Sequence, residues 1–171
     1  MSGHNRWQQI RHKKALTDKK KGQIFSKLSR LITLAAKKGA DPKTNQALAQ
    51  AIEQAKTNNM PGENIERAIK KISDKDQAQL EELTIEALGP GGTALRIRAI
   101  TDSRNRTISE VKKILNDFGS KMVQPDSLSW MFSQPAAIDA SNQEKLDKLI
   151  EALDDQEEVE EVSTNLKEDI A

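Results

Sequence analysis

The sequence predicts an α+β protein: an N-terminal three-helix basic domain, then a two-layer α/β domain with a four-stranded sheet covered by two helices. Charge divides the chain, because residues 1–76 hold 17 Lys/Arg against 7 Asp/Glu, whereas residues 77–171 hold 10 against 19. The spacing of apolar residues also changes there, from three or four residues to two. We therefore expect domains at 1–76 and 80–171, and the +10 and −9 halves explain the net charge of +1.

Residues 2–21 form a basic segment with little helical periodicity, and we expect a partly helical arm. Its single aromatic residue, Trp7, could stack on a base or anchor the arm to the helices, and we favour the anchor.

Three amphipathic helices follow the arm. In residues 23–38 the apolar side chains recur at helical spacing, and Gly39 ends the pattern. Asp41 and Pro42 resemble a cap and first turn for a second helix, which Asn58 and Asn59 close. A third helix starts near Pro61, and its buried stripe lies within residues 65–72.

The second domain begins with a predicted β-hairpin, made of strands at 83–88 and 93–101 around the turn at 89–92. A capping box at 107–110 opens a helix that ends at Gly119, and a second box at 141–144 opens a helix over 145–153. Alternation in residues 127–133 predicts a strand with Trp130 and Phe132 in the core, and residues 159–166 supply the last strand.

Several classes of protein are disfavoured by composition. The chain has no cysteine, and its histidines, His4 and His12, both lie in the arm, so we expect no catalytic site and no metal site. No apolar stretch is long enough to span a bilayer, and the N-terminus lacks the apolar core of a secretory signal. We expect a cytoplasmic protein with no membrane partner. The glycine-rich turn at 89–92 lacks the Lys-Ser/Thr ending of a phosphate loop, and the acidic run at 154–161 lacks a calcium-loop pattern.

The basic arm and helix faces favour nucleic acid as the partner, because phosphate binding requires only several cations that reach a regularly charged backbone. The alternatives are a solvated arm, or two oppositely charged halves that attract each other. Arg96 and Arg98 could bind phosphate or pair with carboxylates. The candidate contact residues are Arg6, Arg11, His12, Lys13, Lys14, Lys19, Lys20, Lys21, Lys27, Arg30, Asn64, Arg67, Lys70 and Lys71.

The chain resembles the YebC/PmpR family of probable transcriptional regulators, which is related to a mitochondrial translational activator of cytochrome oxidase. The resemblance lies in the sequence blocks at 3–7, 10–15, 22–28, 58–61, 64–71, 89–92, 101–107, 148–153 and 159–166. Typical members carry a third domain between the positions of Phe132 and Ser141, where this chain has only a short loop (about 133–141).

The resemblance implies a cofactor-free cytoplasmic protein that acts on transcription or on translation. Our leading hypothesis is a DNA-binding transcriptional regulator. The alternative is a ribosome-associated translation activator that uses the same basic surface on ribosomal RNA. A third class, a module that binds only other proteins, would use the acidic domain instead. The oligomeric state stays open.

Overall fold

The computed structural model describes residues 5–13, 17–73 and 79–167, and its contacts form two compact units. The helical unit contains Leu16–Glu81 and Ile100–Ser103, and the sheet unit contains Met1–Ala15, Glu82–Ala99 and Arg104–Ala171. The expected division placed residues 1–15 with the helices, whereas the contacts place them with the sheet.

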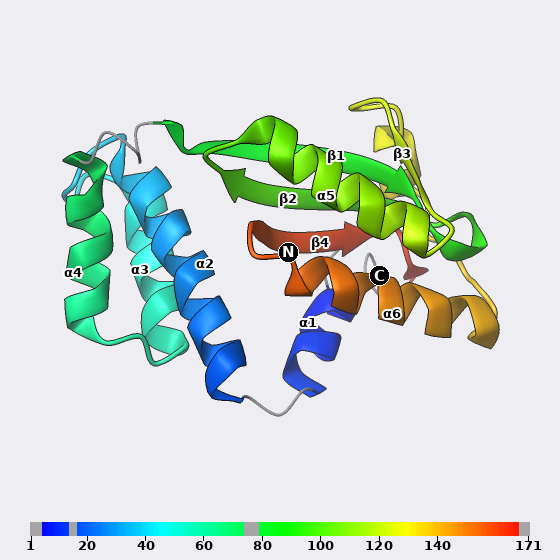
Figure 1. Cartoon of the computed structure of the whole chain (residues 1–171), viewed down its shortest axis with the longest axis horizontal. Coiled ribbons are helices and arrows are strands. Elements are labelled where there is room, and N and C mark those ends of the chain that lie inside the picture. The colour runs from blue at the N-terminus through cyan, green and yellow to red at the C-terminus, as the bar shows by residue number, and fades with distance from the viewer. Residues whose placement is uncertain (1–4, 14–16, 74–78, 168–171) are drawn as a thin grey trace. The chain divides into compact units, whose positions relative to one another are not determined.

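The helical unit consists of α2 (Asp18–Ala36), α3 (Gln46–Thr57) and α4 (Gly62–Lys70), followed by the short 3₁₀ helix η1 (Lys71–Ser73). The three helices run up, down and up, so that α2 and α4 start at the same end of the unit, where α3 finishes (Figure 1). The apolar stripes predicted for the three helices meet in one core, which includes Leu28, Ile32, Leu48, Ala55 and Ile65.

Two helices of this unit begin at residues other than those expected. The hydroxyl of Thr17 accepts a hydrogen bond from the Lys20 amide at 3.2 Å, so α2 starts at Asp18 and not near Gln23. The N-cap of α3 is Asn45, whose Oδ1 accepts from the Leu48 amide while its Nδ2 donates to the Ala35 and Gly39 carbonyls. Asn45 therefore supplies hydrogen-bond partners both to carbonyl groups at the end of α2 and to an amide at the start of α3. Asp41, the expected cap, lies five residues before the first residue of α3 and is too distant from it to act as its N-cap.

The sheet has four strands in the order β3-β1-β2-β4: β1 (Glu81–Leu88), β2 (Ala94–Thr101), β3 (Lys121–Val123) and β4 (Val159–Thr164). Antiparallel pairing joins β3 to β1 and β4 to β2. Between β1 and β2 lies the 3₁₀ turn η3 (Pro90–Gly92), where Gly91 has φ +71° and a Cβ would lie 2.6 Å from Ile138 Cγ2. The glycine-rich segment is a turn between two neighbouring strands, as expected.

The core of the sheet unit lies between one face of the sheet and three helices: α1 (Asn5–Lys13), α5 (Arg104–Asp117) and α6 (Ala140–Asp155). Alternate residues of the strands, such as Ile85 and Ile97, pack against Val111 of α5 and Leu149 of α6. The expected α+β fold is confirmed, with α1 as an additional helix on the core. Trp7 of α1 is only 7% exposed.

The predicted strand at 127–133 is wrong. The third strand is Lys121–Val123, and Ser129–Ser133 form the 3₁₀ helix η4, in which local bonds such as Met131 N–H to Leu128 O replace ladder bonds. Trp130, expected in the core, is 61% exposed.

The two capping boxes do not start their helices. α5 begins at Arg104, three residues before Thr107, which is buried within the helix. Asp139 caps α6 by accepting from the Asn142 amide at 2.7 Å.

The burial of Trp7 makes a prediction about stability. Trp7→Ala leaves a cavity in the sheet-unit core and should lower the free energy of unfolding by about 3–5 kcal/mol. Trp130→Ala is the matched control, and it should cost far less because that side chain is exposed. Urea unfolding of the full chain measures both. Equal losses would contradict the assignment of α1 to the sheet-unit core.

Candidate nucleic-acid interface

The candidate residues predicted from the sequence lie on three helices. Arg6, Arg11, His12 and Lys13 belong to α1, Lys19–Lys21, Lys27 and Arg30 to α2, and Asn64, Arg67, Lys70 and Lys71 to α4 and its C-terminal end. Lys14 lies outside the described residues. Because α1 packs in the sheet unit, the predicted set is divided between the two units and is not one continuous surface on the helical bundle.

The two arginines of α1 form ion pairs with α6. Arg6 binds Asp147 through two hydrogen bonds, one of them from Nε to Oδ1 at 2.7 Å. Arg11 Nη2 donates to Asp154 Oδ1, also at 2.7 Å. Such paired guanidinium–carboxylate contacts are the stronger kind of ion pair. Both guanidinium groups therefore already have an anionic partner within the sheet unit.

Asp154 also receives a hydrogen bond from Trp7. The Trp7 Nε1–H donates to Asp154 Oδ1 at 2.8 Å, and the Arg11 guanidinium lies 4.2 Å from the centroid of the Trp7 ring. The contacts of Trp7 therefore agree with its interpretation as an anchor. It anchors α1 to the sheet unit, however, and not to the helical bundle as expected. His12 and Lys13 at the end of α1 are exposed.

The placement of α1 greatly reduces the charge asymmetry. Counted by the contact-defined units, the helical unit holds 13 Lys/Arg against 9 Asp/Glu, a net +4. The sheet unit holds 14 against 17, a net −3. Part of the asymmetry along the sequence thus reflects opposite charges that neutralise each other where α1 meets α6.

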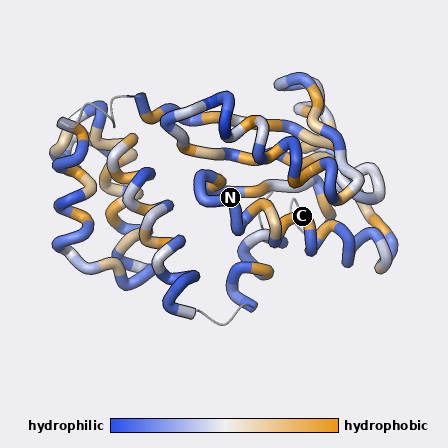
Figure 2. Tube along the Cα trace, viewed as in Figure 1, coloured by the Kyte–Doolittle hydropathy of each residue, from blue (hydrophilic) through white to orange (hydrophobic). Residues whose placement is uncertain are grey.

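The start of α2 carries three consecutive lysines, Lys19, Lys20 and Lys21, in its first turn. The partial positive charge of a helix N-terminus favours anions there and disfavours cations, so only Asp18 suits this position. This segment is hydrophilic in Figure 2. Further along α2, Lys27 is buried and Arg30 is half-buried, whereas in the first turn Lys19 and Lys21 are exposed and Lys20 is half-buried.

The cations of α4 lie at the favourable end of their helix. Arg67 and Lys70 occupy its last turn, where the partial negative charge of a helix C-terminus stabilises them. Asn64 is half-buried, and the solvent side of the helix also carries the exposed acids Glu63 and Glu66. The basic residues of α4 are therefore explained by the stability of the helix without a ligand.

The sequence interpretation missed four lysines among the described residues of the helical unit. Lys37 and Lys38 follow the last turn of α2 and Lys43 lies in the loop after it, at the end of the unit where α4 finishes (Figure 1). Lys56 lies in the last turn of α3. Their positions at or beyond helix C-termini could have been inferred from the sequence. Such positions indicate that a lysine stabilises its helix, and they do not indicate that it binds a ligand.

The outer face of the sheet is not a cationic surface. Arg96 Nη2 lies 3.4 Å from Glu86 Oε2, and Phe132 stacks on its guanidinium at 4.1 Å. Arg98 Nη2 lies 3.3 Å from Glu161 Oε2. Carboxylates rather than phosphates are therefore the partners of these two arginines.

Neither a metal centre nor a membrane span occurs in the part of the chain that the structure describes. No group of three His, Asp or Glu side chains there could hold a metal ion. None of its helices is both long and apolar enough to cross a bilayer.

The fold and surface define a class of protein: a two-unit α+β protein with three consecutive lysines at the start of a helix. Residues 5–75 match the TACO1/YebC protein N-terminal domain, and residues 80–144 match the TACO1/YebC second and third domain. The chain belongs to the TACO1/YebC family, as its resemblance to YebC/PmpR proteins predicts.

Relatives of known sequence carry the name probable transcriptional regulatory protein. One from Prosthecochloris aestuarii is 45% identical over 159 residues, which cover 89% of this chain and 64% of the relative. One from Geotalea uraniireducens is 44% identical over 175 residues, covering 96% of this chain and 71% of the relative. The chain spans about two thirds of the length of these two relatives.

The fold also matches a crystal structure. A conserved hypothetical protein from Aquifex aeolicus superposes with a TM-score of 0.78 and 28% identity, covering 90% of this chain and 93% of that one.

The contacts of Asp154 lead to a second prediction. Asp154→Asn keeps the size of the side chain but removes the charge that Arg11 and Trp7 share, so unfolding should require about 1–3 kcal/mol less. A double-mutant cycle with Arg11→Gln, measured by urea unfolding, isolates the pairwise contribution. Strict additivity of the two single changes would show that the ion pair does not hold α1.

Proposed function

We propose that this chain is a nucleic-acid-binding regulator of gene expression, specifically a DNA-associated transcriptional regulator that holds phosphates at the start of α2. It acts by binding, without a catalytic step and without a cofactor. The names of its relatives support regulation of transcription. The lysine cluster of α2 supports an anionic partner.

The observation that carries the proposal is the placement of Lys19–Lys21 against the helix dipole. Three ammonium groups beside the partial positive charge of a helix N-terminus raise the free energy of the unbound protein. A phosphate there relieves this repulsion, and it can also accept hydrogen bonds from backbone amides of the first turn. A polyanion is therefore the partner for which this arrangement is favourable.

Two features limit how this surface binds DNA. α3 and α4 lie antiparallel in a hairpin (Figure 1), unlike a helix-turn-helix, whose two helices cross at a large angle. The basic residues of α4 are moreover interleaved with Glu63 and Glu66. We therefore assign α4 no base-reading role and attribute affinity mainly to phosphate contacts.

Replacing Lys19, Lys20 and Lys21 by glutamine tests the proposal. If each lysine neutralises one phosphate, the slope of log K against log salt on duplex DNA should become less steep by about 2.7. The same variant should unfold at higher denaturant concentration, because the repulsion with the helix dipole is removed. Weaker binding together with higher stability is the expected result.

The matched control replaces Lys38, Lys70 and Lys71, which removes the same charge from the opposite end of the helical unit. This variant should keep most of the salt slope. Equal losses from the two triple variants would reject the start of α2 as the binding site. Strong binding to ribosomes in low salt, with no binding to duplex DNA, would instead favour the translational role on ribosomal RNA.

A further inference from the structure

The outer face of α3 carries a row of carboxamides. Gln46, Gln50, Gln54 and Asn58 follow one another at four-residue spacing, and all four side chains are exposed. Four residues advance a helix by about 6 Å and slightly more than one turn, so these amides form one slowly turning row. None of the four bears a charge, which separates this face from the lysine-rich ends of the unit.

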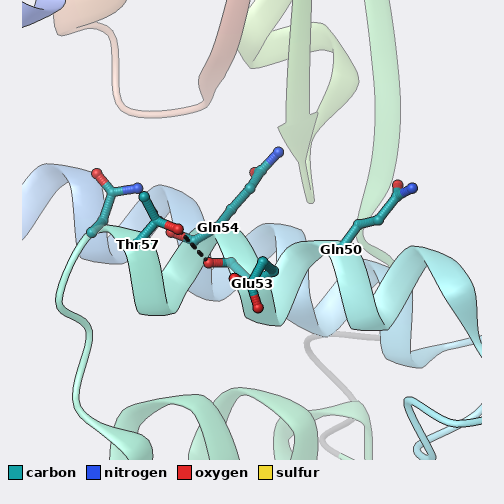
Figure 3. Close-up of a pocket in the computed structure, with 5 residues that line it drawn as sticks. Gln50, Glu53, Gln54 and Thr57 are labelled. Carbon is teal, nitrogen blue, oxygen red and sulfur yellow. Dashed lines mark hydrogen bonds between the residues drawn. The ribbon is translucent and has the colours of Figure 1, made fainter.

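The same face holds a shallow cavity of about 330 Å³, lined by Gln50, Glu53, Gln54, Thr57 and Asn58. Figure 3 shows Gln50 and Gln54 extending to the same side of α3 with their amide groups at the free ends. Within the described part of the chain neither of these two amides has a hydrogen-bond partner. Thr57 and Asn58, by contrast, donate to the backbone carbonyls of Glu53 and Gln54 at 2.9 and 2.8 Å.

The chemistry of this lining selects the ligand class. Drug-sized ligands usually need an enclosed, mostly apolar pocket, and protein partners usually need an aromatic or apolar anchor at the centre of the interface. The lining residues provide neither. Carboxamides supply paired donors and acceptors, which match the edge of adenine in the major groove, and a carboxylate accepts from the amino group of cytosine. An α-helix also fits the width of that groove.

The row lies on the same bundle as the phosphate-binding lysines. Because α2 and α3 are antiparallel neighbours, Asn58 at the end of α3 lies at the end of the unit where α2 starts with Lys19–Lys21 (Figure 1). Phosphate contacts position a protein on duplex DNA, and contacts to base edges specify the sequence. The helical unit thus presents both types of contact, the lysines at its end and the amides along its side.

We propose that α3 is the base-reading element of this protein, with Gln50 and Gln54 as the residues that determine sequence preference in duplex DNA. This inference rests on the proposed function, because it requires the lysines of α2 to hold the DNA backbone.

The experiment compares the full-length wild type with the double variant Gln50→Ala and Gln54→Ala. Selection from a random-sequence duplex pool followed by sequencing gives the preference, and titration of a mixed-sequence duplex gives the non-specific affinity. The double variant should lose at least about tenfold in preference, since it removes two paired amide–base contacts, each of which discriminates against the wrong base. Its non-specific affinity should change less than about twofold. Circular dichroism checks folding, which alanine on an exposed helix face should not impair.

The control is the pair Asn64→Ala and Arg67→Ala on α4, which should leave the preference unchanged. The inference is overturned if this control relaxes the preference, if the α3 variant retains it, or if the wild type selects no sequence. These outcomes leave the proposed function intact, because that proposal depends on the salt slope of the Lys19–Lys21 variant. If that slope does not change, the proposed function fails whatever the selection shows.

Discussion

The hydrogen bonds that Asp154 accepts from Trp7 and Arg11 are the constraint on which the rest of the structure depends. Together with the Arg6–Asp147 pair, they hold α1 on the core of the sheet unit. In this placement Arg6 and Arg11 are both paired with carboxylates of α6. The lysines of the helical unit take part in neither of these two ion pairs.

Helix electrostatics separates these remaining cations into two groups. Lys38, Lys70 and Lys71 lie at or just beyond helix C-termini, where they stabilise the fold. Lys19–Lys21 lie at a helix N-terminus, where they destabilise it. Residues that lower stability in the unbound state are common at binding sites, because the ligand supplies the compensating interaction. The direction of the helix, rather than the number of cations, therefore identifies the proposed phosphate site.

Much of the fold was predictable because apolar periodicity is a local property. The buried stripes of α2, α3 and α4 and the two hairpin strands all agree with their spacing in the sequence. The contacts of α1 were not predictable, since Arg6 and Asp147 are 141 residues apart and periodicity carries no information about such pairs. The alternation at 127–133 was misleading because so short a pattern also fits a 3₁₀ helix. The sequence thus supplied the candidate cations, but selecting among them required knowing which helix end each occupies.

Hydrogen exchange of backbone amides, measured with and without mixed-sequence duplex DNA, tests the central claim most directly. The amides at the start of α2 are exposed at the end of the helix, where Lys20 N–H already bonds to the Thr17 hydroxyl. We expect bound DNA to slow exchange at residues 18–21 and to leave residues 37–38 and 70–71 unchanged. Protection confined to the C-terminal ends of α2 and α4, or to the outer face of the sheet, would contradict the account.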